Sequence, residues 1–571
     1  MKILNKILMI GLVVMISACS TDLDLLDNPN EVTPENANID DLFNSVQLNF
    51  ATNQGRLWFT PGGMARMISF GGAYDYTSGT NPNFFNGLWF GSYASMFPDI
   101  DAIEALASER GLNFHSGGAK ILKSITLTQL VDMFGDVPFT QAGDGTGTIS
   151  PVADSGADVY AAADALLDEA IALLAEPGPA PANDLVYGGD ASKWIKLAKT
   201  LKLRNAVTTR LVNSNAAATI NALVAEGDII TSTADDFQVQ YAVTRQNPGS
   251  RHPLYYNMYE SGDGSYMSNY YMWLLKGEKT NEFGDPVEDP RIRFYFYRKT
   301  PDAAGLDPNV YSCHFSNLPT QIDKPAHYAS VDPRIPYCIA APDGYFGRDH
   351  LNAEGIPPDG QFRTAYGLYP VGGQFDDNSF SNTQNEGTTG GLGQGIEPLL
   401  LASFVDFLRA EAALTVGTSD DARALLESGV RKSIAKVFSF AALVPSTMSR
   451  GIVDVVTGDE NPVSDVYVPS AAKIDEYVAL VLSNYDAADD KLDVVMKEYY
   501  IALWGNGFEA YNMYRRTGKP NNMAPALEPN PGPFIRSFFL PGDHVNRNAN
   551  AEQKELTEPV FWDNNPATLT Y

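Results

Sequence analysis

The stretch YYIALWGNGFEAYNMYRRTGKP, residues 499–520, carries the clearest fold signal in the sequence. Its apolar side chains recur at helical spacing, which predicts a buried helical face. That face consists of Tyr500, Leu503, Trp504, Phe508 and Tyr511. Arg515 and Arg516 suit the negative end of a helix, and Gly518 and Pro520 follow as stop signals. The stretch therefore predicts a packed helix that ends just after the two arginines.

Two more helical patterns lie upstream, separated by the turn TVGTSDD. One covers residues 399–414 and the other runs from Ala422 to Val437. Thr418 and Ser419 in the turn are suitable helix N-caps. Two antiparallel helices joined by a short turn form a helical hairpin, the unit of tetratricopeptide-like arrays. No strict 34-residue repeat is present, so any such array is degenerate.

The remaining chain divides into helical and irregular parts. Further helices are predicted at 159–174 and 194–201, and near 40–54, 85–107, 118–134, 470–483 and 490–515. The segment from about 277 to 395 has no sustained helical period and is rich in Gly, Pro, Asp, Asn and Tyr. We expect short strands in it, such as Arg291–Tyr297, and a flexible glycine-rich lead into the helix at Leu399. Long irregular segments are commonly functional. The predicted fold is therefore mostly α, a helical scaffold with a long loop excursion.

The N-terminus predicts export and lipidation. Lys2 and Lys6 precede a ten-residue apolar stretch, Ile7–Ile16, that is too short to span a bilayer. Ser17 and Ala18 are small residues before Cys19, as in a bacterial lipobox. We expect residues 1–18 to be a signal peptide, Cys19 to carry acyl chains, and residues 19–38 to form a polar tether.

The net charge of the mature chain limits the kinds of partner that it can bind. Loss of residues 1–18 removes two lysines and no acids, so 38 Lys and Arg face 69 Asp and Glu, a net charge of −31. Such a charge repels nucleic acid and anionic headgroups. We therefore exclude a nucleic-acid role. The two cysteines that remain, Cys313 and Cys338, form a disulfide only if their geometry permits.

Four segments together resemble the SusD-like (SusD/RagB) family of nutrient-binding outer-membrane lipoproteins. They are DNPNEVTPENANIDDLFNSVQLNF (27–50), MFGDVPFTQA (133–142), KWIKLAKTLKLRNAV (193–207) and the stretch 499–520. The first resembles the branch of the family that starts with an Asn-Pro-Asn element. Phe404, where an acidic residue is usual, and the loose Gly542-Asp543-His544 ending depart from the family pattern.

The resemblance implies a single SusD-like domain over residues 39–571. It also implies a partner, a SusC-like TonB-dependent barrel in the outer membrane, over which the protein sits as a lid. The protein would face the cell exterior, bind oligosaccharide or, alternatively, peptide, and have no enzymatic activity.

Aromatic side chains in polar loops are the predicted ligand contacts, because a flat ring stacks on the C–H face of a sugar. The first loop, FGGAYDYTSGTNPNFFNGLW (70–89), contributes Tyr74, Asp75, Tyr76, Asn81, Phe84 and Asn86. The second, SYMSNYYMWLL (265–275), contributes Tyr270 and Trp273. Ordinary packing is the alternative for both loops, and it is favoured for Trp89. Trp58 and Trp562 are lesser candidates. We expect Tyr76→Ala combined with Trp273→Ala to weaken ligand binding with little loss of fold.

Motifs for catalysis and cofactors are missing from the sequence. It contains no H-E-x-x-H, no G-x-S-x-G and no P-loop, and its six histidines lack metal-ligand spacing. We predict no cofactor. The pair Asp376-Asp377 could hold a structural Ca²⁺, although a solvated surface is the favoured interpretation. Two readings besides a binding protein stay open, a surface glycoside hydrolase and a purely structural adaptor.

Overall fold

A computed structural model describes residues 37–71, 73–143, 147–262, 265–301, 324–337, 343–353, 363–381, 386–565 and 569. The predictions for Cys19, for the signal peptide and for the pairing of Cys313 with Cys338 lie outside these residues. The described chain is mostly helical, as predicted, and its strands form three two-stranded antiparallel sheets.

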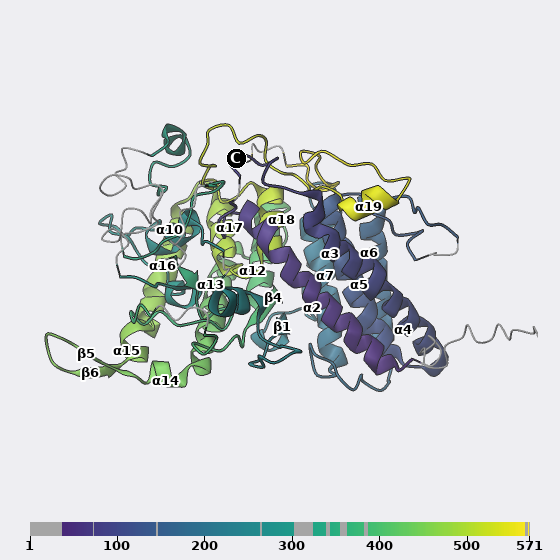
Figure 1. The fold of residues 1–571 in the computed structure, drawn as a ribbon, viewed down its shortest axis with the longest axis horizontal. Helices are drawn as coiled ribbons and strands as arrows, with labels where there is room; N and C mark the ends of the chain where they lie inside the picture. The colour runs from purple at the N-terminus through teal and green to yellow at the C-terminus, as the bar shows by residue number, and fades with distance from the viewer. Residues whose placement is uncertain are drawn as a thin grey trace, which may run out of the picture.

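One group of helices comes from the N-terminal half (Figure 1). It contains α3 (Asn86–Phe90), α4 (Phe97–Arg110), α5 (Asn113–Phe134), α6 (Gly156–Ala175), α7 (Ala191–Thr208) and α8 (Ala216–Glu226). Neighbouring helices pack in pairs, α4 with α5, α5 with α6, α6 with α7 and α7 with α8. The period that predicted residues 159–174 reflects the buried face of α6, whose N-cap Ser155 accepts from the Asp158 amide.

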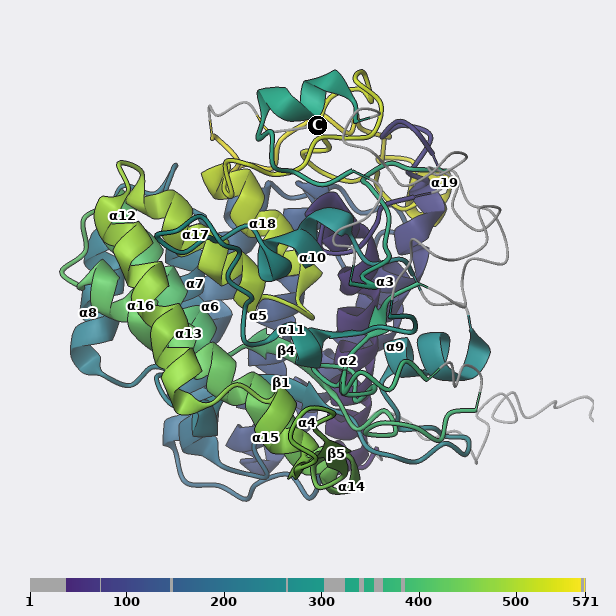
Figure 2. The ribbon, with the colours of Figure 1, turned by 90° about the vertical axis from the view of Figure 1, so that its left-hand side faces the viewer.

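The second group comes from the C-terminal half and contains the predicted hairpin. It comprises α12 (Ala402–Thr415), α13 (Ala422–Phe438), α16 (Ala471–Ala487), α17 (Lys491–Ala502) and α18 (Gly507–Thr517). The helix α2 (Ile39–Met64) crosses between the two groups and packs against both α4 and α18 (Figures 1 and 2). The hairpin's second helix is capped by Asp421, which accepts from the amides of Arg423 and Ala424, and not by the predicted Thr418 or Ser419.

Short elements complete the fold. The helices are α9 (Pro253–Tyr255), α10 (Asn269–Lys276), α11 (Ile292–Tyr295), α14 (Pro445–Met448), α15 (Val463–Tyr467) and α19 (Gly542–Arg547). The strand pairs are β1 (Phe237–Gln240) with β4 (Ile396–Leu400), β2 (Phe296–Tyr297) with β3 (Ala365–Tyr366), and β5 (Gly451–Val453) with β6 (Glu460–Pro462).

The stretch 499–520 is buried as predicted, but it is two helices and not one. The chain leaves α17 after Ala502, and Gly505 adopts a positive φ of 102° that other residues avoid. Asn506 then caps α18 by accepting from the Glu509 amide at 3.0 Å. Apolar periodicity continues across this break, which is why the pattern alone predicted one helix.

Trp504, at the break between α17 and α18, is the centre of an aromatic cluster. Its ring centroid lies 5.6 Å from Trp58 of α2, 5.0 Å from Tyr271 of α10 and 5.1 Å from Phe296 of β2. Tyr295 and Tyr366 lie 5.8 Å away. The described parts of the loop excursion are therefore packed onto the helical scaffold by the same cluster.

Two predictions for the excursion are wrong in detail. Residues 292–295 form helix α11, and only Phe296 and Tyr297 of the predicted strand pair with β3. The glycines at 390–395 do not form a flexible lead into a helix. A Cβ on Gly390 would lie 2.0 Å from the Gly373 carbonyl oxygen, so these glycines allow two backbones to touch. The chain then enters strand β4, and α12 begins only at Ala402.

Candidate functional site

The first aromatic loop is fastened to the core through Tyr76. This residue is 1% exposed, and its hydroxyl accepts a hydrogen bond from Arg66 Nη2 at 2.9 Å. His350 Nε2 lies 3.1 Å from the same hydroxyl, and the Tyr76 amide donates to the Pro531 carbonyl. Burial raises the pKa of Tyr76, so the phenol stays protonated. Tyr76 is thus an anchor of the loop, in agreement with the packing alternative.

The same loop exposes two of its predicted aromatic contacts. Tyr74 is 38% exposed and Phe84 is 53% exposed. Phe84 lies in a 3₁₀ turn, Pro82–Phe85, and the next ring, Phe85, is buried against Phe134 and Phe538. Alternation between buried and exposed rings along the loop holds the exposed ones on a fixed backbone.

The polar candidates of this loop lie near the surface and fix its backbone. Asp75 accepts from the amide and the hydroxyl of Ser78, each at 2.8 Å, and these bonds lower the pKa of its carboxyl. Asn81 accepts from the Asn83 amide at 2.8 Å. Asn86 donates to the side chain of Asn83 and accepts from the Asp543 amide. All three polar side chains belong to the same loop as the exposed rings and hold its turns in shape.

The second aromatic segment is buried. Tyr270 is 3% exposed and Trp273 is 7% exposed, both in α10. The Tyr270 hydroxyl donates to Asn522 Oδ1 at 3.3 Å, and the Arg334 guanidinium lies 5.7 Å from the Trp273 ring. The segment does run beside the residues that precede the first loop, through a β-bridge between Ile68 and Met267. Packing explains both residues in this structure.

Because Tyr76 and Trp273 are both buried, their double alanine variant is not expected to keep its stability. Tyr76→Ala with Trp273→Ala removes two core side chains and therefore costs stability, because cavities remain where they packed. The lesser candidates Trp58 and Trp562 are likewise 2% and 0% exposed. Trp89 packs between Tyr93, Phe134 and His544, with ring centroids at 4.7, 5.7 and 4.4 Å.

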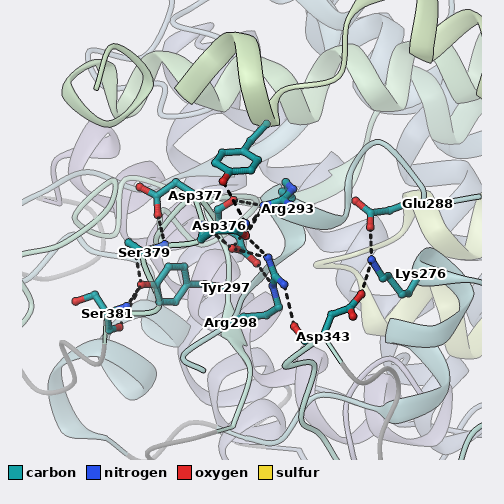
Figure 3. A network of polar contacts seen from close by, with 12 residues as sticks. Lys276, Glu288, Arg293, Tyr297, Arg298, Asp343, Asp376, Asp377, Ser379 and Ser381 are labelled. Atoms are coloured by element: carbon teal, nitrogen blue, oxygen red, sulfur yellow. Dashed lines mark hydrogen bonds and ion pairs between the residues drawn. The ribbon is translucent and has the colours of Figure 1, made fainter. Parts of the chain in front are cut away.

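The carboxylates of Asp376 and Asp377 form ion pairs with arginines in the loop excursion, about residues 277–395, and next to it (Figure 3). Asp376 is fully buried, and Arg298 donates to both of its oxygens, at 2.6 and 3.2 Å. Asp377 accepts from Arg450 Nη2 at 2.6 Å. Arg293 adds a bond to the Asp376 carbonyl and lies 4.4 Å from the Tyr467 ring. The favoured interpretation of a solvated surface is therefore wrong, and the negative charge is neutralised by arginine.

Among the described residues, no three or more His, Cys, Asp or Glu side chains gather in a way that could hold a metal ion. No helix in the described ranges has the length and hydropathy needed to cross a membrane.

Sequence reasoning did not find Phe90, which follows the first loop and is 65% exposed. It also missed the buried carboxyl of Glu397, which lines a groove beside α2. Phe90 was not recognised as an exposed ring because it falls within a helical pattern. Glu397 was not recognised as a buried acid because its segment was interpreted as a lead into a helix.

Two family models match the chain. One, described as "Starch-binding associating with outer membrane", matches residues 31–330, and the other, "Susd and RagB outer membrane lipoprotein", matches residues 392–550. A comparison with curated proteins finds no match.

Solved structures share the fold along almost the whole chain. A chitin-binding protein is 19% identical, with a TM-score of 0.63 over 93% of this chain and 100% of its own. A SusD/RagB family protein of Bacteroides thetaiotaomicron is 18% identical, with a TM-score of 0.62 over 92% and 99%. A chitin-binding SusD homologue of Flavobacterium johnsoniae is 17% identical, with a TM-score of 0.58 over 93% and 100%. Since the first family model alone covers more than half of the sequence, this chain belongs to the SusD/RagB family of outer-membrane lipoproteins.

Proposed function

We propose that this protein captures oligosaccharides at the cell surface and delivers them to a SusC-like TonB-dependent barrel in the outer membrane. The observation that carries the proposal is the pair of exposed rings, Tyr74 and Phe84, on a loop anchored at Tyr76 and Phe85. The family assignment supports the outer-membrane location.

The geometry of the loop suits sugar binding for a physical reason. A sugar ring offers an apolar C–H face and a rim of hydroxyls, so it needs a flat apolar surface beside hydrogen-bonding groups. Tyr74 and Phe84 each supply an exposed flat ring, and Asp75, Asn81 and Asn86 supply carboxylate and amide groups on the same loop. An anchored loop loses little conformational entropy when it binds.

The comparisons favour glycan over peptide as cargo. One family model is named for starch binding, and two of the structurally similar proteins are described as chitin-binding. Their identity to this chain is below 20%, so they support the class of ligand and not a particular sugar.

The proposal includes the anchor and its domain boundaries. Residues 1–18 are removed, Cys19 is acylated, residues 19–38 form the tether and residues 39–571 form the binding domain. Acyl chains hold the protein at the membrane at about 0.8 kcal/mol per buried CH₂ group. The protein acts as a binding protein and not as an enzyme.

The test is a titration of the mature protein with maltooligosaccharides, chitooligosaccharides and a panel of peptides. Saturable binding of one glycan class, with the glycan recovered intact, is the expected result. Binding of peptides alone would change the cargo, and glycan cleavage abolished by a single Asp or Glu substitution would establish a hydrolase. If the protein binds none of these ligands but co-purifies with a barrel from the native membrane, it is a structural adaptor.

A further inference from the structure

A groove of about 750 Å³ lies along α2 and is separate from the aromatic loop. Its walls come from α2, from β1 and β4, from residues 249–254 and from Leu185 and Val186. Figures 1 and 2 both place β1 beside the middle of α2. The volume is in the range of small-molecule sites. None of the ligand contacts predicted in the two aromatic loops lines it, and of the two lesser candidates Trp58 does.

The walls of the groove are mainly apolar. They include Leu48, Phe50, Phe59, Leu185, Val239 and Leu254. Both arginines among the lining residues are engaged: Arg251 donates to Glu260 at 2.7 Å, and Arg56 donates to the Gly87 carbonyl and to Asn53. The walls therefore suit an apolar ligand, and the charged groups at hand already have partners.

One buried polar group in the groove differs from these arginines. Glu397 of β4 lines the groove opposite Val239 of β1, and it is only 5% exposed. The imidazole of His252 lies beside it, with Nε2 3.6 Å from Oε2. Within the described chain, this carboxyl has no hydrogen bond and no ion pair closer than that contact.

Several other buried carboxylates of this fold are paired with arginine. Glu411 accepts from Arg516 and Arg210 at 2.9 and 2.8 Å, and Asp376 accepts from Arg298 at 2.6 Å. A buried carboxyl without such a partner costs stability. A group that is left unpaired in a cavity wall is available to a ligand.

The side chains of Glu397 and His252 are both uncharged at neutral pH. Burial raises the pKa of Glu397 to about 8, so its carboxyl is mainly protonated at pH 7 and can donate a hydrogen bond. Burial lowers the pKa of His252 to about 3, against the opposing effect of a hydrogen bond to the Ile396 backbone. Its Nδ1 accepts from the Leu254 amide at 3.1 Å, which leaves the proton on Nε2. The other titratable side chains that interact electrostatically with Glu397 are Tyr241 and Tyr366, and burial raises the pKa of both.

We propose that this groove is a second small-molecule site, for an uncharged and mainly apolar ligand that presents a hydroxyl or carbonyl oxygen to Glu397. The apolar walls take the body of the ligand, and the carboxyl of Glu397 hydrogen-bonds its oxygen. This site does not depend on the proposed glycan function, because it shares no ligand contact with the aromatic loop.

The first test uses the mature protein and the uncharged fluorescent probe N-phenyl-1-naphthylamine. The probe is expected to bind saturably with one equivalent, and 1-octanol is expected to displace it at concentrations at least tenfold lower than octylamine or octanoate. Ala51→Trp fills the groove from α2 and should weaken probe binding at least tenfold. Ala105→Trp, on the exposed side of α4, is the matched control and should stay within twofold of the wild type.

The second test remains informative if Ala51→Trp fails to fold. Glu397 becomes charged as the pH rises through about 8, so displacement by 1-octanol should weaken at least fivefold between pH 7 and pH 9.5 in the wild type. Glu397→Gln stays neutral and should keep its affinity within twofold over that range. Absence of saturable probe binding, tighter binding of octylamine or octanoate than of 1-octanol, or equal pH dependence in both proteins would overturn the proposal.

Discussion

The loop 73–90 and the segment 265–276 both contain several aromatic rings together with Asn and Ser, yet they place these rings in opposite environments. Tyr74 and Phe84 of the first are half-exposed, whereas Tyr270, Tyr271 and Trp273 of the second are buried. The difference arises from the second segment's helix, α10, which has no polar face and lies against the aromatic cluster around Trp504.

The comparison shows that aromatic content alone does not identify a binding surface. In the loop, buried residues such as Tyr76 and Phe85 alternate with exposed ones, so some rings are kept in solvent. In α10 every aromatic ring has a packing partner. Ligand contacts are therefore expected only where a rigid backbone leaves rings uncovered.

The largest expected effect is on stability, in the buried segment. Tyr271 is fully buried, stacks 5.0 Å from Trp504 and donates to the Ile501 carbonyl at 2.9 Å. Tyr271→Ala should lower the free energy of unfolding by about 3–5 kcal/mol, measured by denaturant titration. Phe283→Ala, at a ring that is 81% exposed, is the control and should change it by less than about 0.5 kcal/mol. Equal effects would erase the contrast between buried and exposed rings.

A smaller effect is expected at the anchor of the loop. Tyr76→Phe keeps the ring but removes the hydroxyl that Arg66 and His350 share. We expect a loss of about 1–2 kcal/mol in the free energy of unfolding, since Arg66 loses a buried acceptor. Tyr256→Phe, at a residue that is 55% exposed, should have no measurable effect. An unchanged stability for Tyr76→Phe would mean that the hydroxyl does not anchor the loop.

The turn that presents Phe84 should respond more weakly. Asn81→Ala removes the side-chain acceptor of the Asn83 amide and should destabilise the turn locally by about 0.5–1 kcal/mol. Hydrogen exchange of residues 82–86 is the measurement, with faster exchange expected. Asn81→Asp keeps the acceptor and should restore slow exchange. If Asn81→Ala exchanges as slowly as the wild type, the turn is held by other contacts.

The smallest effect is a pH dependence confined to Asp75. Its bonds from Ser78 lower the pKa of its carboxyl below the value of about 3.9 that it has in an unfolded chain. A depressed pKa contributes stability at pH values above the unfolded value, and this contribution is lost as the pH falls through the folded value. The Ser78 amide should therefore exchange relatively faster below pH 4. Asp75→Asn should abolish that dependence, and its persistence in the variant would assign it to another group.

Much of the helical scaffold could be predicted from sequence, because a buried helical face repeats over several turns. Residues 159–174 and 422–437 fall within α6 and α13 for this reason. The break at Gly505 and Asn506 was missed because apolar spacing continues across it. Helix α8 was missed because its buried residues, Ala216, Ile220 and Leu223, form too short a pattern.

The candidate site was predictable only in part. Composition identified the loop that carries Tyr74 and Phe84, but it could not separate them from Tyr76. The burial of Tyr76 depends on Arg66, His350 and Pro531, which are close in space and mostly distant in sequence. The groove at Glu397 depends likewise on the pairing of β1 with β4, across more than 150 residues.

The most direct measurement compares glycan binding by calorimetry in three proteins: the wild type, Tyr74→Ala combined with Phe84→Ala, and Phe283→Ala. With the oligosaccharide that binds the wild type, the double variant should lose at least tenfold in affinity, about 1.4 kcal/mol, while its melting temperature stays unchanged. Phe283→Ala should bind as the wild type does. Full affinity in a folded double variant would contradict the proposal that the exposed rings of loop 73–90 hold the cargo.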